Sequence, residues 1–200
     1  MSICRVKLNT ERKYYKYVDT SFTPPTLTAA TNGSMGGDSF GVLASATYGT
    51  NYAWQVFNAA DTGWASTTIP CTLDIYNPNS LNITNIHVQN STNANYGIKT
   101  GYISVSDDGT NWEQITTYSN SVNTAKGIWD ISLSGNTSYY KYYRLGVSTQ
   151  LTSFIGIGEL TLTATERTIT ESTSSDYDFY EDVPVYKAVL SSGNYYALEV

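Results

Sequence analysis

The middle of the chain alternates apolar and polar residues in short runs. In residues 82–89, for example, the apolar side chains of Ile86 and Val88 fall on one face of an extended strand, while Asn85 and His87 fall on the other. A period of two residues is typical of a half-buried β-strand. The same pattern predicts strands at residues 26–30, 40–46, 53–57, 72–76, 82–89, 101–106, 113–118, 127–133, 139–148 and 155–165.

Turn residues separate these runs, including Asn32-Gly33, Asn77-Pro78-Asn79 and Asp107-Asp108-Gly109. Short strands at such spacing predict an antiparallel β-sandwich or barrel. Only residues 53–60 could form a helix, and a helix of that length would contribute little.

The two ends of the chain differ from the middle in charge. Residues 1–30 carry a net charge of +3, residues 31–165 of −4 and residues 166–200 of −5. The first segment contains a basic aromatic run at 13–17, and Pro24-Pro25 then stops any strand. The last segment is acidic and contains two strand-like runs, 183–190 and 195–200, joined by a plausible hairpin turn. We therefore predict an N-terminal arm (1–30), a sandwich (31–165) and a strand-forming tail (166–200).

Composition excludes several classes of protein. The 28 Thr, 22 Ser, 16 Asn and 18 Tyr favour strands and turns over helices. No apolar run approaches the ~20 residues of a transmembrane helix, so we expect no membrane insertion. The net charge of −6 argues against a nucleic-acid partner. The start of the chain alternates instead of forming an apolar signal segment, so we expect a protein made in a cytoplasm.

Catalytic chemistry is not expected. His87 is the single histidine and lies within a predicted strand, where a structural or surface role is the simpler interpretation. Cys4 and Cys71 are read as free thiols, since two cysteines cannot staple a chain of this size. No nucleophile elbow or zinc motif occurs, and nothing singles out a pair of carboxylates as in a glycosidase.

Five segments, taken in order, resemble discoidin-like domains of the coagulation factor 5/8 type C family. They are residues 51–66 (NYAWQVFNAADTGWAS), 71–75 (CTLDI), 103–115 (ISVSDDGTNWEQI), 142–145 (YYRL) and 155–162 (IGIGELTL). The resemblance implies an all-β antiparallel jelly-roll sandwich of the galactose-binding-like type. Relatives include the non-catalytic carbohydrate-binding modules of family 32. We expect Trp64 and Trp112 to be buried at the ends of its core.

The resemblance also implies a site for a structural calcium ion. Here the family's Asp-Gly is replaced by Asn58-Ala59, and the remaining oxygen donors would be Asn58, Asp61, Thr62 and Glu159. The alternative is that the ion has been lost, and that Asn58 and Asp61 only form turn hydrogen bonds.

In the glycan-binding relatives, ligand contacts come from loops at one end of the sandwich. The corresponding loops, residues 48–52, 92–96 and 148–154, combine aromatic rings with amides and hydroxyls, which suits the apolar and polar faces of a sugar. The candidate ligand residues are Tyr48, Asn51, Tyr52, Asn93, Asn95, Tyr96, Gln150 and Phe154.

The flanking segments suggest a context for this domain. An arm, a jelly roll and a strand-forming tail resemble in style a small virion protein of a tailed bacteriophage, attached to neighbouring subunits through residues 1–30 and 166–200. We expect an oligomeric, virion-located display module that binds cell-surface glycan and serves host adhesion. Two alternatives stay open: a purely structural assembly protein with no ligand, and a bacterial carbohydrate-binding protein.

Overall fold

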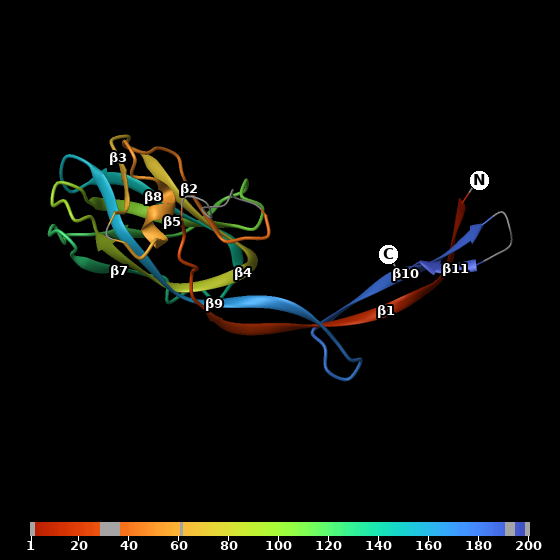
Figure 1. The fold of residues 1–200 in the computed structure, drawn as a ribbon. Coiled ribbons are helices and arrows are strands. Elements are labelled where there is room, and N and C mark those ends of the chain that lie inside the picture. Colours follow the sequence, from red (N-terminus) through yellow and green to blue (C-terminus); the bar gives the residue numbers. More distant parts are fainter. Residues whose placement is uncertain (1–2, 29–36, 61, 191–194, 199–200) are drawn as a thin grey trace. The chain divides into compact units, whose positions relative to one another are not determined.

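The computed structural model describes residues 3–28, 37–60, 62–190 and 195–198. The chain divides into two compact units: Asp19–Arg167, and Met1–Val18 with Thr168–Val200. Nearly all described elements are strands, shown in Figure 1. Their bounds are β1 (Ile3–Phe22), β2 (Gly41–Ala44), β3 (Trp64–Ser66), β4 (Cys71–Asn90), β5 (Ile98–Ser106), β6 (Glu113–Ser119), β7 (Ile128–Ser132), β8 (Tyr140–Gln150), β9 (Ile155–Ser172), β10 (Phe179–Leu190) and β11 (Tyr195–Leu198).

The larger unit is an antiparallel sandwich in which β4 belongs to both layers. The first half of β4 pairs with β2 and β8, and the layer continues through β5 to β6. The second half of β4 pairs with β7 and β9, and β3 pairs with β9. The all-β sandwich expected from the sequence is therefore confirmed.

Strand β4 joins two segments that the sequence predicts as separate strands. The pairing register shifts between Tyr76 and Leu81, around the predicted turn Asn77-Pro78-Asn79. Pro78 has no amide hydrogen for the ladder, which favours an irregularity there. The Nδ2 group of the buried Asn77 donates to the carbonyl of Asn79 and to Oε1 of Glu166, at 2.9 and 2.7 Å, and these bonds hold the bend.

Residues 53–57 form a short 3₁₀ helix, η1 (Ala53–Phe57), so the strand predicted there is wrong. The turn is closed locally by the Tyr52 amide, which donates to Oε1 of Gln55 at 2.7 Å. Residues 23–28 are also outside any strand, although Leu27 is buried and its amide donates to the Phe57 carbonyl. The remainder of the strand predicted at 26–30 lies outside the described residues.

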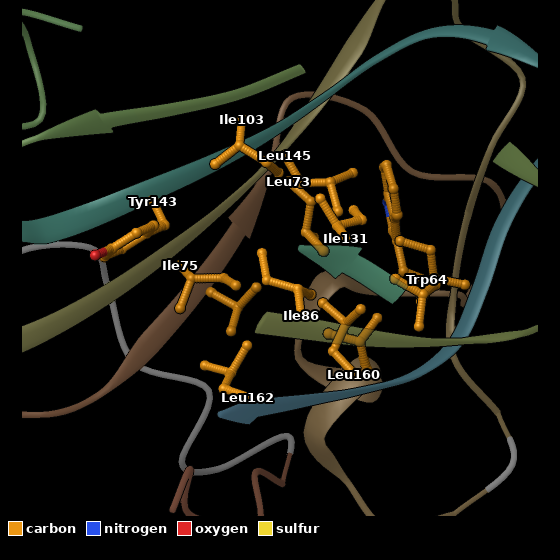
Figure 2. Close-up of a cluster of buried hydrophobic side chains, with 14 of the residues drawn as sticks. Trp64, Leu73, Ile75, Ile86, Ile103, Ile131, Tyr143, Leu145, Leu160 and Leu162 are labelled. Atoms are coloured by element: carbon orange, nitrogen blue, oxygen red, sulfur yellow. The ribbon is translucent and has the colours of Figure 1, made fainter. Parts of the chain in front are cut away.

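Side chains from the two layers of the sandwich meet in one core, shown in Figure 2. Leu73, Ile103 and Leu145 come from one layer, and Ile86 and Leu160 from the other. Each is at most 3% exposed. These positions alternate along their strands with outward-facing residues, as the period of two requires.

Tyr143 is a polar exception within this core. Its hydroxyl donates to the Leu81 carbonyl at 2.8 Å and accepts from the Ile83 amide at 3.2 Å. These bonds connect β8 to the part of β4 that follows the bend. Burial raises the pKa of Tyr143 to about 12.

The two tryptophans predicted to be buried differ in environment. Trp64 is 1% exposed, and its indole Nε1 donates to the Ala46 carbonyl at 2.9 Å, which confirms the prediction for this residue. Trp112 is only half-buried, so the prediction of a core position is wrong. It lies in the hairpin between β5 and β6, where the Arg144 guanidinium stacks over its ring at 3.8 Å.

The smaller unit is a β-ribbon made by the two ends of the chain. Strand β1 pairs antiparallel with β10, from Ile3 opposite Leu190 to Tyr15 opposite Phe179, and β10 pairs with β11. The β10–β11 pairing confirms the hairpin predicted in the tail. From the sequence, both ends are expected to find partners in neighbouring subunits, whereas here they pair with each other within one chain. Opposite charges explain this, because basic residues of β1 face acidic residues of the tail, as in Arg12–Asp182 at 2.9 Å.

We predict that Trp64→Ala lowers the free energy of unfolding by about 3–5 kcal/mol, because it removes a large buried ring and leaves a cavity. Trp112→Ala serves as the control and should cost less, since that ring is partly exposed. Equilibrium denaturation measures both values. A loss below about 1 kcal/mol for Trp64→Ala would contradict its role in the core.

Candidate functional site

Three loops that the sequence singles out meet at one end of the sandwich. Residues 48–52 follow β2, residues 93–96 join β4 to β5, and residues 150–154 join β8 to β9. Backbone bonds fasten the second and third loops: the Gly97 amide donates to the Phe154 carbonyl at 2.9 Å, and the Leu151 amide donates to the Gly97 carbonyl at 3.1 Å. A β-bridge between Tyr96 and Phe154 completes the junction.

The three loops contribute one aromatic cluster. The ring centroid of Phe154 lies 5.3 Å from that of Tyr48 and 4.9 Å from that of Tyr96, the latter edge to face. Tyr48 is 42% exposed, and the other two rings are half-buried. The cluster therefore exposes part of its ring surface to solvent, while contacts between the rings hold them in place. The exposed Tyr52 lies in the same loop as Tyr48.

The predicted amide residues lie in the same loops, and several of them shape the backbone. Nδ2 of Asn51 donates to the Tyr48 carbonyl at 3.0 Å, and Oδ1 of Asn93 accepts from the Asn95 amide at 2.9 Å. The side chains of Asn93 and Asn95 are exposed, and Gln150 is half-buried at the end of β8. The structure thus brings the eight predicted ligand residues to one group of loops.

The predicted calcium donors come from the turn before β3 and from β9, the strand that pairs with β3. Oδ1 of Asn58 accepts from the Ala60 amide at 2.8 Å, and its Nδ2 donates to Oγ1 of Thr62 at 2.7 Å, so the two side chains are bonded to each other. Glu159 instead lines a cleft of about 260 Å³ with His87 and Ile128 on the outer face of β4, β7 and β9. Asp61 lies outside the described residues.

Calcium prefers a shell of several oxygens, commonly with more than one carboxylate. Within residues 3–28, 37–60, 62–190 and 195–198, no group of three or more His, Cys, Asp or Glu side chains is arranged to hold a metal ion. Ala59 nevertheless keeps a positive φ of 54°, the left-handed conformation that suits the glycine of the family pattern at this position.

His87 has partners that the sequence does not reveal. Its Nδ1 lies 2.5 Å from Oδ1 of Asp130, and its Nε2 lies 3.2 Å from Oγ1 of Thr163. The order hydroxyl, imidazole, carboxylate matches that of hydrolase triads. However, both His87 and Asp130 are about half exposed, and the strands that carry them are paired in the sheet, where backbone amides are used for strand pairing.

A second cluster on the opposite layer was also missed from the sequence. Arg144 forms two 2.7 Å bonds with the carboxylate of Asp74, which faces it across the β4–β8 pairing. The hydrogen bonds that Arg144 donates to the Asp74 carboxylate raise the pKa of Arg144. Because the same guanidinium stacks on Trp112, this group connects β4 and β8 to the β5–β6 hairpin in a structural role. The sequence signal for this cluster is the period of two, which places Tyr142 and Arg144 on one face of their strand and Tyr143 and Leu145 on the other.

No family model matches the chain, and no curated protein matches it. Similarity is found among solved structures instead. One is the family 32 module of NanJ from Clostridium perfringens in complex with galactose, with 15% identity, a TM-score of 0.55, and coverage of 62% of this chain and 92% of that one. Another is an F5/8 type C domain from Bacteroides fragilis, with 15% identity, a TM-score of 0.55, and coverage of 62% and 89%.

A third similar structure is a family 32 module of a C. perfringens GH89 protein in complex with GalNAc-β-1,3-galactose. It has 17% identity and a TM-score of 0.54, and the match covers 62% of this chain and 94% of that one. At these identities the likeness establishes the fold. The sandwich has the discoidin-like, family 32 carbohydrate-binding-module fold.

We predict that calcium leaves the melting temperature unchanged, because Asn58 and Thr62 bond to each other and Glu159 lies in the cleft with His87. Thermal unfolding in EDTA, in calcium and in magnesium makes the comparison. At a free calcium concentration of 100 times the Kd, binding to the folded state would stabilise the fold by about 2.7 kcal/mol. A calcium-specific, saturable rise in melting temperature would contradict this reading of the turn.

Proposed function

We propose that the sandwich is a non-catalytic glycan-binding module whose ligand site is the loop end formed by residues 48–52, 93–96 and 150–154. The observation that carries the proposal is the aromatic cluster of Tyr48, Tyr96 and Phe154, which is built from three distant parts of the chain. Rings of this kind stack against the C–H faces of sugars, while neighbouring amides bond to hydroxyl groups.

Neutral sugars suit these loops best. The three loops contain no Lys or Arg that would pair with a uronate, and no acidic residue that would repel one. Two of the similar structures hold galactose and GalNAc-β-1,3-galactose, and another, a module of AlyQ, holds 4,5-unsaturated mannuronic acid. Galactose-containing glycans are therefore the first candidate class, and uronic acids the second.

The absence of catalysis is part of the proposal. The aromatic cluster has no titratable acid or base within its three loops apart from tyrosines. The His87–Asp130 pair lies on a strand-paired face formed by β4 and β7 instead. A site of this composition holds a sugar without supplying the paired carboxylates that glycoside hydrolysis requires.

For the context, we propose that the module is displayed on the virion of a tailed bacteriophage, made in the host cytoplasm, and attached to other virion subunits through its terminal segments. The support is the separate unit formed by Met1–Val18 and Thr168–Val200, which leaves the sandwich loops outside the attachment region. Glycan binding would then serve adhesion to the host. A purely structural assembly protein is the alternative, and it predicts no ligand at all.

We predict that the intact chain binds galactose-containing glycans on a glycan array, and that Tyr48→Ala and Phe154→Ala weaken binding about tenfold, the equivalent of about 1.4 kcal/mol. Leu43→Ala is the control, because Leu43 is an exposed apolar residue (56%) on β2 that lies outside the three loops. Calorimetry on the best ligand measures the affinities.

Circular dichroism checks that each variant remains folded. A folded intact chain that binds no glycan on the array would overturn the proposed function and favour the assembly role. Equal losses in all three variants would contradict the placement of the site at the loop end.

A further inference from the structure

We infer that the β1–β10 ribbon is a self-association surface, and that its partner is the ribbon of a second copy of this chain. The ribbon pairs twelve residues of β1 with residues of β10, from Ile3 opposite Leu190 to Tyr15 opposite Phe179. Strand β11 pairs with β10 only from Tyr186 to Val189, so much of the ribbon has two strands. Isolated two-stranded ribbons are marginally stable in water, because neither face has a layer to pack against. A ribbon of this length therefore gains stability when another surface covers it.

Aromatic rings gather on both faces of the described part of the ribbon. On one face Tyr14 lies 4.8 Å from Tyr177 and 6.4 Å from Tyr180, measured between ring centroids. Consecutive residues of a strand point to opposite faces, so Tyr15 belongs to the other face, where it stacks on Phe179 at 5.3 Å. Tyr17 joins that second cluster, also 5.3 Å from Phe179.

These rings remain substantially open to solvent. Tyr17, Tyr177 and Tyr180 are 42%, 42% and 47% exposed, and Ile169 in the same unit is 59% exposed. Tyr177 and Tyr180 form one exposed pair, with ring centroids 6.2 Å apart, and Tyr17 is exposed on the other face. Exposed rings that lie together are typical of a protein–protein contact, and tyrosine is among the residues enriched there.

Charge favours a second copy as the partner. Residues 1–18 carry a net charge of +4 and residues 168–200 of −5, so the ribbon unit as a whole is close to neutral at −1. Residues 19–167 carry −5, so two sandwich units repel each other, whereas two ribbon units do not. An acidic membrane surface or a nucleic acid would require a net basic ribbon instead.

The distribution of charge within the ribbon is also self-complementary. Basic residues lie on β1 and acidic residues on the tail, as the pairs Arg12–Asp182, Lys13–Glu171 and Lys16–Asp176 show. A two-fold contact between identical ribbons can place the basic strand of one copy beside the acidic strand of the other. Self-association would also present several glycan sites at once and raise the avidity for glycans. This consequence rests on the proposed function, whereas the self-association does not depend on it.

The test is sedimentation velocity of the intact chain over a dilution series, compared with the double variant Tyr14→Ser/Tyr180→Ser. We expect the intact chain to associate, and the double variant to associate at least about tenfold more weakly. Ile128→Ser is the matched control, since Ile128 is 69% exposed but lies on β7 of the sandwich unit, and it should associate as the intact chain does.

The four tryptophans, Trp54, Trp64, Trp112 and Trp129, all lie in the sandwich unit, so their fluorescence verifies that this unit stays folded in each variant. If the double variant loses the ribbon fold, the single variant Tyr180→Ser, at the most exposed of the three rings in its cluster, replaces it. A monomeric intact chain at every concentration would overturn the inference, and so would association that Ile128→Ser disrupts and the ribbon variants do not.

Discussion

The sandwich depends on one strand that pairs in both of its layers. Strand β4 lies between β2 and β8 in its first half and between β7 and β9 in its second half, as Figure 1 allows the reader to follow. Strands that pass from one layer to the other form the corners of sandwiches, and they do so at bends or bulges. Here the corner is the irregular segment around Pro78, which the buried Asn77 holds to Glu166. Without this bend, β4 could not pair in both layers of the sandwich.

The end of the same strand positions the proposed ligand site. Asn90, the last residue of β4, is 2% exposed, accepts from Nε1 of Trp129 at 3.0 Å and donates to the Val122 and Thr124 carbonyls. Buried hydrogen bonds of this kind contribute about 1 kcal/mol each, and leaving one partner unsatisfied costs more. The loop at 93–96 therefore starts from a fixed point. Its bonds to the 150–154 loop then bring Tyr96 against Phe154.

Local patterns predicted most strands because apolar residues alternate wherever a strand has one buried face. These patterns predicted the wrong element where side-chain hydrogen bonds, which the patterns do not reveal, decide the local structure. The segment Asn77-Pro78-Asn79 has the composition of a turn, yet its amides bond to Glu166, 87 or more residues away, and β4 continues through it. Residues 53–57 alternate like a strand, but the Gln55 side chain closes a 3₁₀ turn on the Tyr52 amide. The same limit explains His87, whose partners Asp130 and Thr163 come from neighbouring strands.

The loop residues of the proposed site came from family resemblance, whereas their ring contacts join Tyr48 to Phe154 across the whole domain and leave no local signal. The pairing of the chain ends did have a signal, because the charges of residues 1–30 and 166–200 are opposite.

The most direct test of the account is an NMR titration of the isotope-labelled chain with galactose, followed residue by residue through the backbone amides. We predict saturable shifts confined to residues 48–52, 93–96 and 150–154, with the rest of the sandwich unchanged. Shifts centred on the Trp112 hairpin or on the His87 face would contradict the placement of the site. The absence of any shift with galactose, with GalNAc and with a uronic acid would contradict glycan binding itself.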